Sequence, residues 1–226
     1  MLKAILPILI GAVVAILIFF LVFHSFKKKS MLLMKAVYID KDYDAYRKLL
    51  NSWTCKLFLS KKQRLILNMA VYEGENKENE LLNVFEQLHR IKLNAQQDLD
   101  LYYNEIRYYM RKKNTDKIEE LYHEVKEKYK NESASYIKGI LKEMYYLYEV
   151  DYKENTKLLS EVKKLYENIS VEQSKGIFAA RCCRLYLKKN DLKNAKEYYE
   201  KAVQHLNKEM ADQLLYDVSD KIKDFC

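Results

Sequence analysis

Cysteine and histidine are the residue types through which this chain could bind a metal ion or perform redox chemistry. It has four of each, at Cys55, Cys182, Cys183 and Cys226 and at His24, His89, His123 and His205. No CxxC motif occurs, and no histidine has a second histidine or cysteine three or four residues away, so the spacing predicts no metal site. Cys182 and Cys183 are adjacent, a spacing that a helix does not readily bridge. We interpret them as small core-filling residues in a reducing compartment, with a redox-active vicinal pair as the alternative.

Motifs for enzyme catalysis are also missing from the sequence. It contains no P-loop, no GxSxG, no HExxH and no glycine-rich dinucleotide-binding turn. Its carboxylates are interleaved with lysines at helical spacing, as Glu197 is with Lys201, which is typical of solvent-exposed helix surfaces. We therefore expect no enzyme activity and no cofactor.

The composition predicts that the elements carrying these side chains are helices. Only 4 glycines and 1 proline occur in 226 residues, which favours nearly continuous helix over a chain of tight hairpin turns. The 20 tyrosines suit a thin core, because tyrosine fills gaps between helices while its hydroxyl stays hydrated. The formal charge is +8, but acidic residues are interleaved with basic ones almost everywhere after Lys35. The bias toward Lys, Asn, Tyr and Ile suggests an AT-rich, bacterial genome.

Polar turn clusters divide the chain at nearly even intervals. Their centres are Lys41, Asn76, Asn114, Asp151 and Asp191, which are 35, 38, 37 and 40 residues apart. Apolar residues at helical spacing flank each cluster. A period of this length is typical of solenoids built from helical hairpins.

The last of these units carries a family resemblance. Small Cys183, aromatic Tyr186, then Ala195, Tyr199 and Ala202 occur in the order typical of the tetratricopeptide repeat, and the chain resembles that superfamily from about Leu33 to Leu206. Asn190 replaces the usual turn glycine of the family, and the closing proline is absent. The resemblance implies an all-α fold, an antiparallel helical-hairpin solenoid of about five units. We expect a C-terminal capping helix over Lys208–Phe225. A long-helix bundle or coiled coil is the competing fold, but the turn clusters interrupt any sustained heptad seam.

An apolar run at the start of the chain predicts a transmembrane anchor. Ala4 to Phe23 carries no charge over 20 residues, about the length that spans a bilayer as a helix. The alternative, a cleaved signal peptide, lacks a small-x-small cleavage site after the run. We therefore expect an anchor over 1–26, a basic juxtamembrane segment over 27–35 and a repeat domain over 36–226.

Three lysines directly after the run predict the orientation of the anchor. Lys27, Lys28 and Lys29 follow it, whereas Lys3 alone precedes it. The positive-inside rule then predicts a single-pass membrane protein whose repeat domain is cytoplasmic. The same three lysines are expected at the membrane surface, against anionic headgroups.

The resemblance also implies a partner-binding groove, because the first helices of successive hairpins line the concave face of such solenoids. The groove-facing positions are Tyr103, Arg107, Arg111, Tyr145, Tyr148, Arg184 and Lys188. Arginine binds carboxylates bidentately and tyrosine offers contact area at low entropic cost, so these residue types suit an acidic or aromatic protein or peptide partner. The Lys/Asn set with which some members of the superfamily clamp a C-terminal carboxylate does not occur at matching positions.

Two further functions stay open on the sequence. The net charge and the Arg/Tyr-rich face permit nucleic-acid binding, although no Lys/Arg-dense stripe occurs beyond the juxtamembrane triplet. A structural membrane protein that self-associates as a homo-oligomer through its end cap is the other alternative.

Overall fold

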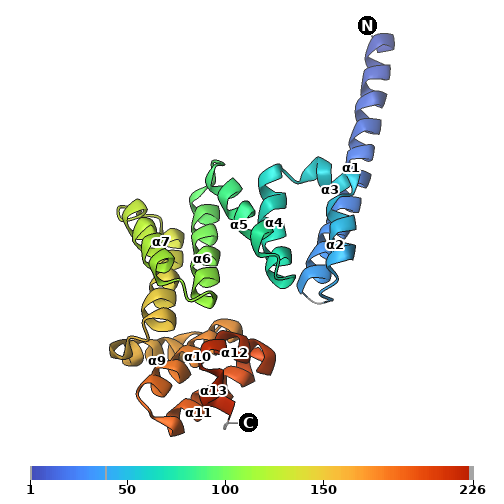
Figure 1. The fold of residues 1–226 in the computed structure, drawn as a ribbon. Helices are drawn as coiled ribbons and strands as arrows, with labels where there is room; N and C mark the ends of the chain where they lie inside the picture. The colour runs from blue at the N-terminus through green and yellow to red at the C-terminus, as the bar shows by residue number, and fades with distance from the viewer. Residues whose placement is uncertain (1, 39, 224–226) are drawn as a thin grey trace. The chain divides into compact units, whose positions relative to one another are not determined.

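The computed structural model of the chain describes residues 2–38 and 40–223, and the side chains of 19–37 and 40–223. Within this part of the chain the fold is all-helical and contains no strand, as the composition predicts. The chain divides into two compact units, Met1–Leu93 and Asn94–Cys226, which we call unit 1 and unit 2 (Figure 1).

The helices of unit 1 are α1 (Leu2–Tyr38), α2 (Tyr43–Leu50), α3 (Trp53–Phe58), α4 (Lys61–Gly74) and α5 (Glu78–His89). Those of unit 2 are α6 (Ala95–Arg111), α7 (Thr115–Lys128), α8 (Ser135–Tyr146), α9 (Leu159–Asn168), α10 (Glu172–Lys188), α11 (Leu192–Leu206), α12 (Lys208–Leu214) and α13 (Ser219–Ile222). Three short segments of other helix types complete unit 2: η1, a π-helix (Leu147–Tyr152), and the 3-10 turns η2 (Thr156–Leu158) and η3 (Tyr216–Val218).

Five turns share one backbone conformation, and they recur near the positions where the sequence predicts them. Each contains a residue with positive φ: Lys41 (51°), Asn76 (55°), Lys113 (55°), Glu154 (50°) and Asn190 (57°). These residues are 35, 37, 41 and 36 positions apart. A left-handed residue ends the preceding helix, because the chain can then fold back without continuing the helical hydrogen bonds.

A capping side chain follows the left-handed residue in most of these turns and begins the next helix. Asp42 accepts a hydrogen bond from the Ala45 amide at 2.9 Å, and Asp191 accepts one from the Asn194 amide at 3.2 Å. Asn114 does the same for the Lys117 amide at 3.2 Å. The turns thereby join α1 to α2, α4 to α5, α6 to α7 and α10 to α11 as hairpins of packed helices.

The fourth repeat departs from this plan. Helix α8 passes directly into the π-helix η1, and α9 packs chiefly on α10 rather than back on α8. Asp151, which the sequence predicts as the centre of the turn, lies in this π-helix. There it lines a cavity of unit 2. The turn itself lies three residues later, at Glu154.

Helix α1 connects the apolar run to the core of unit 1 without a break. Its last turns contribute Leu33, Ala36 and Val37 to a core shared with Tyr46, Leu50, Cys55 and Val71. Among the helices whose side chains are described, none is long and apolar enough to cross a membrane. Most of the predicted anchor, residues 1–18, lies outside the described side chains.

The C-terminal segment differs from the single capping helix expected over Lys208–Phe225. The chain forms α12, the turn η3 and then α13, with a break at Leu215, whose side chain is fully buried. The break directs Asp217 toward α10, where it meets Arg184. Phe225 lies outside the described residues.

Three of the four cysteines lie in the cores as free thiols, in agreement with the core-filling interpretation. Cys55, Cys182 and Cys183 are all 0% exposed. Burial raises the pKa of the Cys182 and Cys183 thiols to about 12. Cys226 lies outside the described residues.

Candidate functional site

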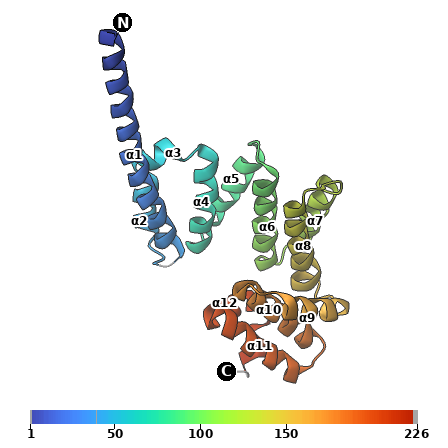
Figure 2. The ribbon, with the colours of Figure 1, turned by 180° about the vertical axis from the view of Figure 1, so that it is seen from behind.

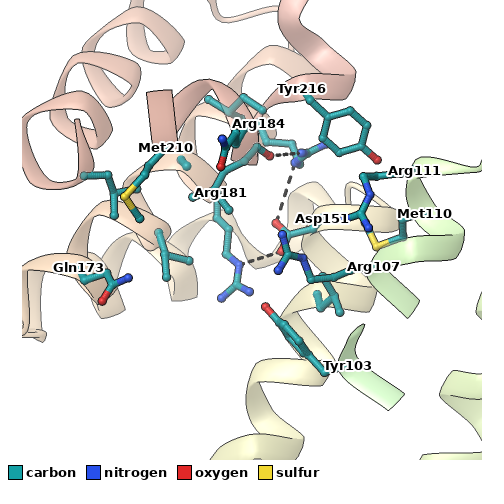
Figure 3. A pocket seen from close by; sticks show the side chains of 17 residues that line it. Tyr103, Arg107, Met110, Arg111, Asp151, Gln173, Arg181, Arg184, Met210 and Tyr216 are labelled. Carbon is teal, nitrogen blue, oxygen red and sulfur yellow. Dashed lines mark hydrogen bonds and ion pairs between the residues drawn. The ribbon is translucent and has the colours of Figure 1, made fainter. Parts of the chain in front are cut away.

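Unit 2 contains a cavity of about 270 Å³ between α6, η1, α10 and the C-terminal segment (Figure 3). Helix α6 is fixed at its start by a capping box, in which Asn94 and Gln97 bond reciprocally to one another's backbone amides. Its residues Tyr103, Arg107 and Arg111, spaced by four, lie on one face and reach the cavity together. Helix α10 contributes Arg181 and Arg184 in the same way, at a spacing of three.

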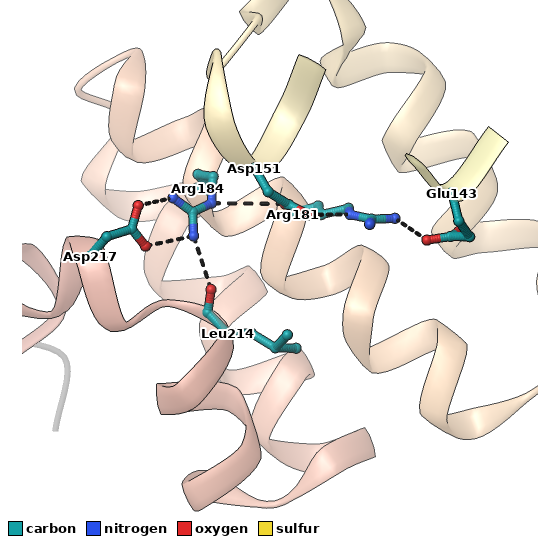
Figure 4. Close-up of polar contacts among 6 residues, drawn as sticks. All are labelled: Glu143, Asp151, Arg181, Arg184, Leu214 and Asp217. Atoms are coloured by element: carbon teal, nitrogen blue, oxygen red, sulfur yellow. Dashed lines mark hydrogen bonds and ion pairs between the residues drawn. The ribbon is translucent and has the colours of Figure 1, made fainter. Parts of the chain in front are cut away.

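Arg181 and Arg184, which we call the inner arginines of the cavity, belong to a buried ion network (Figure 4). Arg181 is 3% exposed and donates from Nε to Asp151 at 3.1 Å and from Nη1 to Glu143 at 3.0 Å. Burial alone would lower the pKa of Arg181, but the carboxylates of Asp151 and Glu143 outweigh it and raise that pKa, so the side chain remains charged. Its guanidinium also lies 5.3 Å from the centre of the Phe178 ring.

Arg184 lies on the other side of Asp151 and is likewise fixed by hydrogen bonds. It is 2% exposed, and its Nη2 donates to Asp217 Oδ1 at 2.7 Å and to the Leu214 carbonyl at 2.9 Å. Its Nε lies 3.9 Å from Asp151 Oδ1. The Leu214 carbonyl is at the end of α12, where no helical amide follows to bond it, so Arg184 supplies the missing donor. Asp151 thus links both inner arginines, and Arg184 ties α10 to the C-terminal segment.

Arg107, on α6, differs from Arg181 and Arg184 in charge balance. Arg107 is exposed, and its guanidinium lies 5.9 Å from the centre of the Tyr103 ring. It makes no ion pair with any residue that the structure describes. Burial raises the pKa of Tyr103 although Arg107 opposes this effect, so the phenol stays neutral. Figure 3 shows Tyr103, Arg107 and Arg181 directed into the same space, with Tyr216 beside Arg111.

The rest of the cavity wall is mainly apolar. It includes Met110 and Leu147 on one side and Ile177, Ala180, Leu206 and Met210 on the other. The cavity therefore offers a cationic group with two tyrosines at one part of its wall and a hydrophobic surface elsewhere. This combination suits an anionic group attached to an apolar or aromatic one.

Four of the seven groove residues named from the sequence meet at this cavity: Tyr103, Arg107, Arg111 and Arg184. The other three lie elsewhere in unit 2. Tyr148 is 6% exposed and stacks on Tyr122 with ring centres 3.7 Å apart. Lys188 pairs with Glu154 at 2.8 Å, and Tyr145 packs against the core beside Tyr146.

Sequence reasoning missed Arg181, Asp151 and Tyr216. Arg181 had a usable signal, because it precedes Arg184 by three residues and so shares its helix face. The sequence predicts Asp151 as the centre of a turn, and nothing local in the sequence connects Tyr216 with α6. Lys27, Lys28 and Lys29 lie on α1, the first two of them exposed.

No protein-family model matches the chain, and no curated protein or solved structure matches it either.

Proposed function

We propose that this protein is a membrane-anchored adaptor of the helical-hairpin, TPR-like kind, and that the cavity of unit 2 binds an acidic segment of a protein partner. The observation that carries the proposal is the contrast between the arginines. Arg181 and Arg184 are neutralised by Asp151, Glu143 and Asp217, whereas Arg107 stands at the same cavity with no ion pair in the described chain.

The chemistry of the cavity favours a carboxylate beside an apolar or aromatic side chain. A guanidinium offers two parallel N–H donors to a carboxylate, which is the geometry of a strong, charge-assisted contact. Tyr103 and Tyr216 add aromatic surface, and Met110 and Ile177 add apolar surface. At about 270 Å³ the cavity fits one or two side chains of an extended peptide rather than a whole folded element.

The five recurring turns and the continuous α1 support the rest of the proposal. Left-handed residues 35 to 41 positions apart suit a solenoid of helical hairpins, whose repeats have about this length. Because α1 enters the core of unit 1 through Leu33, Ala36 and Val37, an anchor at its N-terminal part would be joined directly to unit 1. Lys27, Lys28 and Lys29 favour a cytoplasmic position for those repeats.

The binding proposal is tested with synthetic fluorescein-labelled peptides and the full chain in detergent micelles, by fluorescence anisotropy. One probe alternates Glu with Phe, and its matched partner carries Gln in place of every Glu. We expect the Glu peptide to bind more tightly, and Arg107→Glu to weaken its binding by about tenfold or more, the effect of losing one charge-assisted contact.

Arg90→Glu is the matched control, because it changes the net charge equally at a side chain that is 72% exposed and pairs with Glu86 in unit 1. Equal affinity for the two peptides, or equal losses in both variants, would contradict the proposal. A labelled single-stranded RNA is the third probe. Binding of that RNA that exceeds peptide binding and falls steeply with salt would favour nucleic acid instead.

A further inference from the structure

Helix α3 exposes two large apolar side chains that nothing in the described chain covers. Trp53 is 63% exposed and Leu57 is 64% exposed, and their spacing of four puts both on one face of the helix. The opposite face is fixed in place, because Thr54 and Cys55 are each 0% exposed. Trp53 is also the one tryptophan of the chain.

Phe58, at the end of α3, sets the level of this helix along α1. Its ring centre lies 6.2 Å from that of Phe19, 5.9 Å from that of Phe23 and 4.9 Å from that of Phe26. These three phenylalanines occupy one face of α1 and cover about 10 Å of its length. In unit 1, α3 therefore lies beside α1 where the N-terminal part of α1 extends past the other helices (Figures 1 and 2).

The same level of α1 is the boundary between its apolar and basic parts. Phe19, Phe20 and Leu21 are 56%, 63% and 72% exposed, and Lys27–Lys29 follow within two turns. Trp53 and Leu57 thus belong to a helix that lies at the level where α1 also exposes apolar side chains. Tryptophan at such a boundary is typical of the layer between acyl chains and headgroups.

The stretch of sequence around α3 carries only basic charged residues, one of which, Arg47, pairs with Glu75 outside the stretch. Residues 45–72 include six basic side chains and no Asp or Glu. These six are Arg47, Lys48, Lys56, Lys61, Lys62 and Arg64. Lys56, which precedes Leu57 on α3, and Lys61, at the start of α4, are both exposed. An anionic lipid surface matches both features, because each lysine near it contributes favourably while the apolar face enters the interface.

We propose that α3 is a second membrane contact, in which Trp53 and Leu57 enter the interfacial layer of an anionic bilayer and Lys56 and Lys61 lie against its headgroups. This inference rests on the proposed anchor, which brings α3 to the bilayer. Two attachments, α1 and α3, would fix the orientation of unit 1 on the membrane, whereas α1 alone leaves it free to rotate about the helix axis.

Trp53 reports on the contact directly. The full chain is reconstituted into vesicles of phosphatidylcholine and phosphatidylglycerol, with or without lipids brominated near the headgroup end of the acyl chains. We expect the emission of Trp53 to shift to shorter wavelength on reconstitution and to lose intensity with the brominated lipids. The shift should be larger than in vesicles of phosphatidylcholine alone. Leu57→Glu should reduce both effects.

A matched control places the tryptophan at a different position of unit 1. In the double variant Trp53→Tyr, Asp44→Trp the indole stands near the start of α2, at a position whose side chain is 86% exposed and which follows the end of α1. This indole should show neither shift nor quenching. Vesicle flotation separates the two proposals. Co-flotation without quenching of Trp53, or equal quenching at position 44, overturns the α3 contact alone, whereas failure to float overturns the anchor together with it.

Discussion

Asp151 and Arg181 form a buried ion pair in which Arg181 Nε donates to Asp151 Oδ2 at 3.1 Å. Arg181 is 3% exposed, and Asp151 also faces Arg184, so one carboxylate serves two buried cations. Without the Asp151 carboxylate, Arg181 would keep only the carboxylate of Glu143 and Arg184 only that of Asp217, so two desolvated arginines would each lose part of their charge compensation.

Asp151→Asn should therefore destabilise unit 2 strongly. We expect the free energy of unfolding to fall by about 1–3 kcal/mol, the usual cost of leaving buried donors without an acceptor, because each arginine keeps one other carboxylate. Urea titration followed by circular dichroism measures it. Glu127→Gln is the control, because Glu127 is 70% exposed and pairs with Lys130 on the surface of α7, and it should change stability by less than about 0.5 kcal/mol. Similar losses in both variants would contradict the network.

Two glycines in helices of unit 2 should respond to alanine with opposite signs. A methyl group at Gly176 would lie 2.4 Å from Leu206 Cγ, whereas one at Gly139 meets nothing within 4 Å. Gly176→Ala should lower the free energy of unfolding by about 1–3 kcal/mol, because the buried Leu206 must move. Gly139→Ala should raise it by about 1 kcal/mol, since alanine favours helix. Urea midpoints of the two variants test this, and a loss at Gly139 would be inconsistent with the open space there.

The left-handed turns give a third prediction. Lys113 has φ 55°, a conformation that costs a side chain about 1 kcal/mol and glycine nothing. Lys113→Gly should therefore raise the melting temperature, even though glycine normally weakens a helix. Lys126→Gly, at an exposed position inside α7, should lower it. If both substitutions lower the melting temperature, the left-handed backbone at position 113 does not favour glycine over lysine.

These turns also show how far the sequence could predict the fold. Lys41 and Asn76 were predicted as turn centres and are the left-handed residues themselves, and Lys113 and Asn190 lie one position from their predicted centres. Local chemistry determines such turns, so local sequence reveals them. The fourth turn was misplaced by three residues, because the π-helix η1 widens the chain before it, and hydrophobic periodicity carries no signal for one added residue per turn.

The cavity was less predictable for a similar reason. Helical spacing alone groups Tyr103, Arg107 and Arg111 on one face of α6. It cannot show that Arg184 meets Asp217, 33 residues later, through a break in the C-terminal segment. Arg184 was expected in the groove and does line the cavity, but its guanidinium is committed to Asp217 and Leu214, so it is unsuited to a charge-reversal test of binding.

Alkaline pH should destabilise unit 2 through its buried thiols. Burial raises the pKa of Cys182 and Cys183 from the ordinary value of 9.0 to about 12. Between these values the unfolded chain releases protons that the folded chain keeps, so the unfolded state gains stability as pH rises. The contribution of the two thiols to the free energy of unfolding should be constant below pH 9.0 and fall between 9.0 and about 12.

The double variant Cys182→Ala, Cys183→Ala isolates this effect, because it keeps the buried tyrosines and removes both thiols. Its free energy of unfolding should fall less steeply over the same pH interval in urea titrations. An unchanged slope would mean that the thiols ionise as readily in the folded chain as in the unfolded one.

The most direct test of the central claim, that Arg107 receives a carboxylate of the partner, is a charge exchange. The Glu–Phe peptide and a matched Lys–Phe peptide are titrated against the wild-type chain and against Arg107→Glu, by anisotropy at one salt concentration. We predict that the wild type prefers the Glu peptide, and that Arg107→Glu reverses this preference toward the Lys peptide while Arg90→Glu leaves it unchanged. If Arg107→Glu keeps the wild-type preference, or Arg90→Glu reverses it equally, the cavity does not bind the acidic segment through Arg107.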